Sequence, residues 1–323
     1  MIETERDKAN LREQRDKVNL PDVSVPEPSL NWGAQLPWVG MREIEVPVKV
    51  KLPQGAMLIA GRLDLGVSLD RKEARGIHMS RLFRLAMESL PQNELTLSLL
   101  SDLATRSLET HAELSTSVKL ALKFNLPLAR EALKSQGLGW RNYPVLIRFE
   151  KRVNAEASLE KALLEVDVLY SSTCPASAAL SRQLNEEASL NHFTGDEIRR
   201  DELKQWLHSP ASLAATPHAQ RSRATVRVEL APSEWGRDLA ELLASLVNRL
   251  EDALGTPVQT LVKREDEQEF ARRNAENLMF CEDAARRLMQ ALEASPEFLS
   301  FEGEVAHFES LHPHDAVATF AKS

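Results

Sequence analysis

The chain has 323 residues, 43% of them hydrophobic, which is enough for a sizeable core in two modest domains or one large pseudo-symmetric one. Its formal net charge of −8 argues against nucleic-acid and membrane partners, which attract basic surfaces, and no apolar run of about 18 residues predicts a membrane helix. The charged start is no secretory signal and Cys174 and Cys281 follow no disulfide pattern, so we expect a cytoplasmic protein.

The first half of the chain predicts an arm followed by strands and helices. Residues 1–30 are charged and then contain several prolines, a composition that buries too little apolar surface to order itself. We predict a mobile arm here, the alternative being a strap that contacts a partner. Period-two and period-3.6 patterns then predict the order ββααββ, with elements at 38–50, 55–69, 78–90, 93–110, 112–124 and 144–153.

The second half repeats this order of elements. Strands are predicted at 159–170, 222–230, 300–308 and 315–321. One helix is predicted to begin after an N-cap at Ser233, and a second helix is predicted over 266–293. The sequence thus predicts two diverged units, 31–155 and 156–323. The polar segment 183–217 interrupts the second unit, and we expect a surface insertion there, with a lid over the site as the alternative.

Cys174 is the cysteine with possible chemical partners. It follows the predicted strand 159–170 and precedes Pro175, and in the predicted hairpin His218 lies at the adjacent strand end. Catalytic Zn²⁺ and similar ions take three Cys, His or carboxylate ligands and leave one position for water. We therefore favour a metal site over a buried inert thiol and an isolated surface histidine.

Charged residues near these two supply a candidate carboxylate ligand and candidate anion contacts. Glu267 ends a Lys-Arg-Glu-Asp-Glu run at the head of a predicted helix, where carboxylates often only complement the helix dipole. The functional interpretation makes Glu267 a ligand and Lys263 or Arg264 a phosphate contact. Arg221, close after His218, adds positive potential for an anion.

Two predicted helices carry candidate substrate contacts. Glu282 borders the apolar face of 266–293, where a glutamate is normally solvated or paired. A half-buried glutamate is, however, suited to accept two N–H donors from a guanine or pterin edge. His78 opens the helix 78–90, where free N–H groups and Arg81 can face an anion, although a core or capping role fits equally well.

Histidines cluster near the C-terminus, where three of the eight fall within 307–314. His312 and His314 flank Pro313, so we expect an extended backbone with the two rings pointing in different directions. Imidazole titrates near neutrality. Each ring is therefore a candidate for proton transfer, against the alternative of an ordinary loop histidine.

Together these stretches resemble the type IB GTP cyclohydrolases, the bacterial enzymes that open the folate pathway. The matches come in the family's order over roughly residues 20–320. They are LPDV (20–23), VGM (39–41), GIHMSR (76–81), Cys-Pro-x-Ser (174–177), HAQRS (218–222), KREDE (263–267), Phe-x-Glu-Asp (280–283) and FESLHPH (308–314). No single motif is specific, whereas the six longer ones in order are hard to obtain by chance.

The resemblance implies an α+β tunnelling fold of two tandem ββααββ units, with antiparallel sheets and helices packed on one face. It further implies a homotetramer with active sites between subunits. In the family's pattern Cys174, His218 and Glu267 bind one divalent metal, Zn²⁺, Mn²⁺ or Fe²⁺, while Glu282 anchors guanine and His312 transfers protons. We add further candidates for catalysis or substrate contact: His314, Glu309, His78, Arg81, Arg221, Lys263 and Arg264.

The predicted reaction is hydrolysis of GTP to 7,8-dihydroneopterin triphosphate and formate. The chain departs from the family's pattern at Ala176, Ala219 and the 183–217 insertion. The first two departures leave the proposed ligands intact, whereas the insertion bears on the shape of the pocket entrance and with it on rate or regulation. Two alternatives stay open. One is an archaeal-type cyclohydrolase with a cyclic phosphate product, and the other is a non-catalytic descendant that binds a nucleotide or serves as a scaffold.

Overall fold

One antiparallel sheet of eight strands forms the body of the protein. In the computed structural model, residues 34–52, 55–154 and 157–322 are described, and the predicted arm, 1–30, lies outside them. The strands pair in chain order from one edge of the sheet to the other. They are β1 (Leu36–Leu52), β2 (Gly55–Leu69), β3 (Ser117–Glu131), β4 (Leu138–Val153), β5 (Ser158–Thr173), β6 (Ala219–Leu230), β7 (Phe298–His307) and β8 (Ala316–Lys322).

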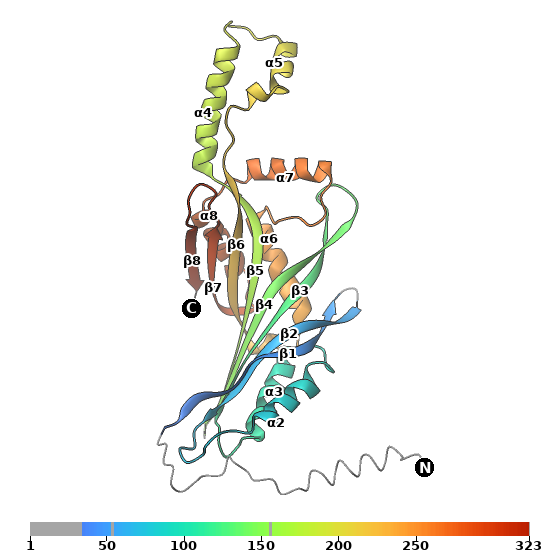
Figure 1. Ribbon diagram of the computed structural model, residues 1–323, viewed down its shortest axis with the longest axis vertical. Helices are drawn as coiled ribbons and strands as arrows, with labels where there is room; N and C mark the ends of the chain where they lie inside the picture. The colour runs from blue at the N-terminus through green and yellow to red at the C-terminus, as the bar shows by residue number, and fades with distance from the viewer. Residues whose placement is uncertain (1–33, 53–54, 155–156, 323) are drawn as a thin grey trace, which may run out of the picture.

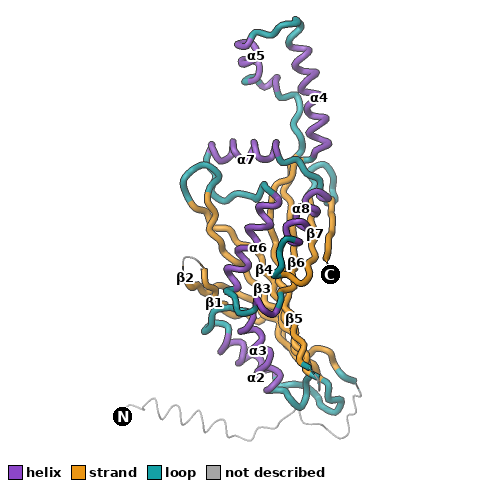
Figure 2. The backbone as a smooth tube through the Cα atoms, turned by 180° about the vertical axis from the view of Figure 1, so that it is seen from behind, coloured by secondary structure: helices purple, strands orange, loops and turns teal. Residues whose placement is uncertain are grey.

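Helices cover one face of this sheet, as Figures 1 and 2 show. The helices of the body are α2 (Met79–Ser89), α3 (Leu97–Glu109), α6 (Leu239–Leu254), α7 (Arg264–Glu276) and α8 (Cys281–Glu293). The strands alternate buried and exposed side chains, as in β6, where Ala224, Val226 and Val228 are fully buried. The predicted α+β class and the two successive ββααββ units are confirmed, and the described part of the second unit carries three additional helices, two between β5 and β6 and a third between β6 and β7.

Two local predictions in the second unit were wrong. The helix predicted over 266–293 is two helices, because the break at 277–280 lets Met279 N donate to Thr173 O beside the end of β5. Ser233 does not cap α6. It lies in a 3-10 turn, Pro232–Glu234, and Asp238 caps the helix by accepting hydrogen bonds from Ala240 N and Glu241 N.

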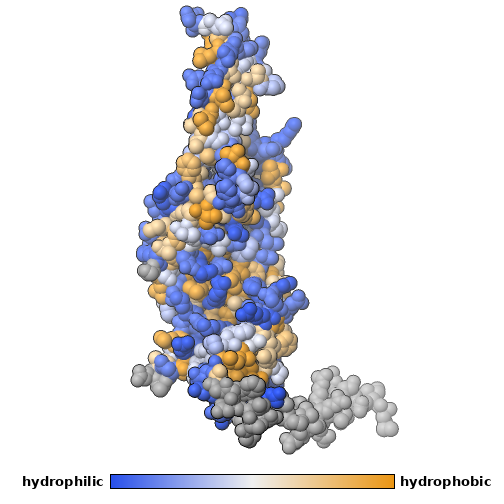
Figure 3. Space-filling model, turned by 60° about the vertical axis from the view of Figure 1, so that its left-hand side comes forward, coloured by the Kyte–Doolittle hydropathy of each residue, from blue (hydrophilic) through white to orange (hydrophobic). Residues whose placement is uncertain are grey.

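A helical arm projects beyond the sheet between β5 and β6 (Figure 1). It comprises residues 175–217 and contains α4 (Pro175–His192), α5 (Arg200–Leu207) and a 3-10 turn, so its helical part begins ahead of the predicted insertion at 183. Its own small core holds the buried Trp206, which stacks on the His192 ring. Figure 3 shows apolar side chains among the polar surface of this helical arm, and Leu180 and Leu190 are exposed there.

The sheet has two ends that are far apart. At the α2 end, β4 finishes at Val153 and β5 begins at Ser158. At the α7 end, β5 finishes beside the start of β6 at Ala219. Since β5 has 16 residues, these ends lie about 50 Å apart at ~3.3 Å per residue. Within the described part of the chain, no helix is long and apolar enough to cross a membrane.

Candidate active site

Cys174 and His218 lie next to each other at the α7 end of the sheet, as the hairpin prediction required. Cys174 N donates to His218 O at 3.2 Å, which continues the β5–β6 ladder. Cys174 also caps α4, since its Sγ accepts from Ser177 N at 3.4 Å. Ser177 Oγ in turn accepts from His218 N at 3.1 Å. Ser177 therefore joins the two residues, a role that sequence reasoning missed although Ser177 belongs to the Cys-Pro-x-Ser motif.

Two further polar side chains adjoin His218. Its Nε2 lies 3.7 Å from Glu309 Oε2, and Glu309 Oε1 accepts from Gln220 Nε2 at 3.3 Å. Gln220 is buried, and its Oε1 has no partner among the described residues. That oxygen can accept an N–H group from a ligand. Sequence reasoning gave Gln220 no role, although it occupies a core-facing position of β6 within the HAQRS motif.

The third predicted metal ligand does not join this pair. Glu267 is exposed on α7, and within the described ranges no three His, Cys, Asp or Glu side chains form a metal-sized cluster. However, Asn274 of the same helix accepts from Ser171 Oγ at 2.6 Å, close to the end of β5. Seven residues make almost two helical turns, so Glu267 shares the face of Asn274. The thiol, imidazole and carboxylate fit a borderline divalent ion in type, and two of the three residues are joined by a backbone hydrogen bond.

Glu282 lies close to this end of the sheet, at the start of α8 and three residues after Met279. It is exposed, whereas the sequence pattern placed it at the border of the apolar face. Its own backbone N–H and the Cys281 thiol, 3.3 Å from Oε2, lower the pKa of Glu282. Burial raises the pKa of Cys281 to about 11, so the thiol stays protonated and donates. Glu282 is therefore an ionised carboxylate, able to accept two N–H groups.

A buried histidine lies near Glu282. The Nε2 of His307 is 2.9 Å from the hydroxyl of Tyr170, and both side chains are buried. Burial lowers the pKa of His307 to about 4, so the ring is neutral at physiological pH. The two side chains therefore belong to the buried core at the α7 end of the sheet.

The predicted proton-transfer histidines differ from expectation in one respect. The rings of His312 and His314 are stacked, with centroids 5.0 Å apart and an interplanar angle of 11°, so the prediction of divergent rings was wrong. Residues 310–314 form a series of bends instead of an extended strand, which brings alternate side chains to the same side. Both residues are exposed.

The predicted basic contacts fall into separate places. Lys263 and Arg264 are exposed at the N-terminus of α7. Arg221 lies on the opposite face of β6 from the buried Gln220, because successive strand residues alternate. The α7 end therefore offers Lys263 and Arg264 to an anion on the helix side, and Arg221 on the open face of the sheet.

His78 and Arg81 lie at the α2 end, far from all the other candidates. His78 precedes α2, and its ring centroid lies 6.3 Å from that of His111. Arg81 NH1 donates to Thr110 O at 2.9 Å. The sheet length of about 50 Å between the ends exceeds the reach of any nucleotide. One chain therefore does not bring His78 and Arg81 together with Cys174.

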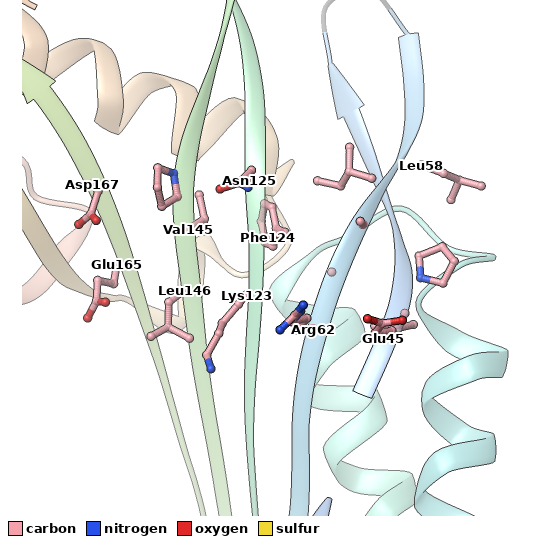
Figure 4. Close-up of a pocket in the computed structure, with 16 residues that line it drawn as sticks. Glu45, Leu58, Arg62, Lys123, Phe124, Asn125, Val145, Leu146, Glu165 and Asp167 are labelled. Atoms are coloured by element: carbon pink, nitrogen blue, oxygen red, sulfur yellow. The ribbon is translucent and has the colours of Figure 1, made fainter. Parts of the chain in front are cut away.

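A cavity on the body of the protein contains none of the predicted site residues (Figure 4). Its volume is ≈ 880 Å³, and strands β1 to β5 line it. Its two basic side chains, Arg62 and Lys123, already pair with Glu43 at 3.0 and 2.6 Å. Together with Glu43, the lining carboxylates Glu45, Glu165 and Asp167 outnumber these two positive charges, so the cavity is not a ready site for an anionic substrate.

Solved structures with the same architecture are urate oxidases. A highly active mutant of the Bacillus sp. TB-90 enzyme matches with a TM-score of 0.52 at 9% identity, over 88% of this chain and 99% of that one. The chloride-free form of the same enzyme gives a TM-score of 0.51 at 8% identity, with the same coverage. At such identities the likeness concerns the fold alone. It confirms the tunnelling fold, to which urate oxidases belong.

Curated relatives are much closer in sequence. GTP cyclohydrolase FolE2 of Bdellovibrio bacteriovorus is 47% identical over 307 residues, which is 95% of this chain and 97% of the relative. The FolE2 protein of Hydrogenovibrio crunogenus is 42% identical over 304 residues, 94% of each chain. The family model described as type I GTP cyclohydrolase folE2 matches residues 20–318. The chain therefore belongs to the type I GTP cyclohydrolase FolE2 family.

Proposed function

We propose that this protein hydrolyses GTP to 7,8-dihydroneopterin triphosphate and formate, with a divalent metal held at the α7 end of the sheet. In this reaction water adds at C8 of guanine, the five-membered ring opens and C8 leaves as formate. The ribose carbons then rearrange and close the pterin ring. The observation that carries the proposal is the backbone hydrogen bond from Cys174 N to His218 O, which makes the two residues neighbours in a chain of the FolE2 family.

The residues that would hold the metal are Cys174, His218 and Glu267. Zn²⁺, Mn²⁺ and Fe²⁺ all accept such a set of donors. A bound ion of this kind acts as a Lewis acid and lowers the pKa of water. The position of Asn274 on Ser171 supports the choice of Glu267, since the two α7 residues share a face.

The remaining side chains bind the substrate and move protons. The ionised Glu282 accepts hydrogen bonds from the N–H groups on the far edge of guanine, so that C8 points toward Cys174 and His218. The buried Gln220 and its partner Glu309 offer further acceptors beside His218. Lys263 and Arg264 neutralise part of the triphosphate, and the N-terminal N–H groups of α7 add to this attraction.

Proton transfer falls to the histidines after β7. The exposed rings of His312 and His314 can take up and release a proton without burying a charge. Opening of the guanine ring requires a proton at the departing nitrogen, and His312 is the donor we assign. His314 stacks on His312 and holds its ring plane.

The site is completed by a second copy of the chain. His78 and Arg81 belong to a motif of the site, yet they lie about 50 Å from Cys174 in one chain. A second subunit that presents its α2 end to the α7 end of the first brings them together. We propose a homotetramer with such shared sites. We place it in the cytoplasm, because both cysteines are free thiols.

Turnover by a ligand variant tests this function. Purified protein with Mn²⁺ or Zn²⁺ is expected to convert GTP into a pterin that fluoresces after oxidation. Cys174→Ala should abolish this conversion and leave the far-UV circular dichroism unchanged, since Cys174 is only partly buried at the start of α4. Full activity of Cys174→Ala would show that the metal assignment is wrong.

A further inference from the structure

A buried carboxylate fixes the N-terminus of α7. Asp266 is 1% exposed, and its Oδ1 accepts from Lys134 N at 2.7 Å and Ser135 N at 2.9 Å. Its Oδ2 accepts from Ser135 Oγ at 2.5 Å and Lys263 N at 2.8 Å. These four bonds use the whole acceptor capacity that a carboxylate ordinarily has. Asp266 therefore links α7 of the second unit to the β3–β4 connection of the first, and we call this linkage the Asp266 clamp.

Close backbone packing accompanies the clamp. Gly137 has φ +143°, and a Cβ added there would lie 2.4 Å from a side-chain carbon of Leu261. A Cβ on Gly139 would lie 2.1 Å from Thr260 Oγ1. The connection thus fits against the segment that leads into α7, and only glycine allows this approach.

A second anchor holds the other half of α7. Asn274 Oδ1 accepts from Ser171 Oγ at 2.6 Å, and its Nδ2 donates to Phe270 O at 2.8 Å. Two anchors on one helix fix both its position and its rotation. Glu267 follows Asp266 by one residue, or about 100° around the axis, so its direction is set by the clamp.

The burial of Asp266 distinguishes the clamp from an ordinary helix-dipole contact. A carboxylate that only complements the dipole stays in water, as the exposed Glu265 does one residue earlier. The hydrogen bond from the Ser135 side chain is the main cause that holds the pKa of Asp266 well below its usual range.

We infer that Asp266 is a positioning residue, which fixes the start of α7 and with it the places from which Glu267 would bind the metal and Lys263 the triphosphate. This inference rests on the proposed function, since it assigns those two residues the roles given above. It also makes the β3–β4 connection a support of the site, although none of its residues contacts a reacting group. Loss of the clamp weakens metal binding without changing any ligand.

The test compares Asp266→Asn with Glu265→Gln, which makes the same chemical change at an exposed neighbour. Hydrogen exchange followed by mass spectrometry reports on 132–137 and 263–268 separately. We expect faster exchange in both segments for Asp266→Asn and in neither for Glu265→Gln. Titration of metal-free protein with Mn²⁺ alone should show a dissociation constant raised about 10- to 100-fold in Asp266→Asn, as for other residues that orient metal ligands.

The outcomes separate this inference from the proposed function. A wild-type protein that binds no Mn²⁺ contradicts the proposed function itself. If the wild type binds Mn²⁺ and Asp266→Asn binds it equally tightly, the positioning role is overturned while the proposed function stands. Should Asp266→Asn fail to fold, Ser135→Ala removes one bond of the clamp. It is expected to raise the dissociation constant by a smaller factor, and an unchanged constant would overturn the inference.

Discussion

The proposed sharing of active sites between subunits leads to a quantitative prediction about mixed oligomers. Arg81, on α2, and Cys174, at the end of β5, lie at opposite ends of the sheet, which β5 spans with 16 residues, so a site that needs both takes them from two chains. Arg81→Ala and Cys174→Ala should each be inactive alone. In oligomers assembled at random from equal amounts of the two, a site receives both intact residues with a probability of one half times one half. We therefore expect about one quarter of wild-type activity to return.

The assay is the formation of fluorescent pterin from GTP after co-expression of the two variants with different affinity tags. Isolation through both tags in turn removes the unmixed oligomers, about one eighth of random tetramers, so the expected activity of the isolated mixed tetramers is about 0.29 of the wild-type value. The matched control combines Cys174→Ala with His218→Ala, because these residues are adjacent in one chain and no mixed site receives both intact. Activity should stay absent there. If mixed oligomers of the Arg81 and Cys174 variants form and remain inactive, the shared site is refuted.

Three further predictions concern single residues. His312→Ala should lower kcat about 100-fold in steady-state assays with an unchanged melting temperature, because the ring is exposed; an unchanged kcat would remove its assigned role. Glu251→Gln should lower the free energy of unfolding, measured in urea, by about 3 kcal/mol. The buried Arg141 guanidinium lies 2.9 Å from the Glu251 carboxylate, and the substitution leaves it without a counter-charge. The exposed Glu241→Gln on the same helix should change stability by less than ~0.5 kcal/mol, and equal effects of the two would contradict this assignment. Finally, burial lowers the pKa of His307 from 6.5 to about 4, so the unfolded chain takes up the proton first as pH falls. Between about pH 7 and about pH 5 wild-type stability should fall by about 2 kcal/mol more than that of His307→Gln, and parallel pH curves would refute the buried neutral ring.

Much of the fold could be predicted because its elements have clear periodicity. The alternation in β1 and β2 and the apolar stripe of α2 match the predicted hairpin and helix. The break between α7 and α8 could not be predicted, because the helical pattern runs on through 277–280. It arises from a long-range hydrogen bond between Met279 and Thr173. Likewise, the stacked pair of His312 and His314 depends on bends that Pro313 alone does not specify.

The candidate site could be predicted only where its residues adjoin in a hairpin. Cys174 and His218 are paired by the strand register, which follows from the alternation of β5 and β6. The burial of Asp266 could not be predicted from the sequence, because the acidic residues on either side of it in the motif are exposed. The separation of Arg81 from Cys174 follows from the chain-order topology of the sheet, which a list of motifs does not contain.

The central claim, that this FolE2 family member is a GTP cyclohydrolase, is tested most directly by the stoichiometry of its products. Metal-loaded protein is incubated with GTP, formate is quantified enzymatically, and the phosphates of the product are resolved by phosphorus NMR. We predict one formate for each GTP consumed and a pterin that retains all three phosphates in a linear chain. A cyclic phosphate with release of pyrophosphate would indicate the other type of cyclohydrolase. Turnover of GTP without formate would contradict the account.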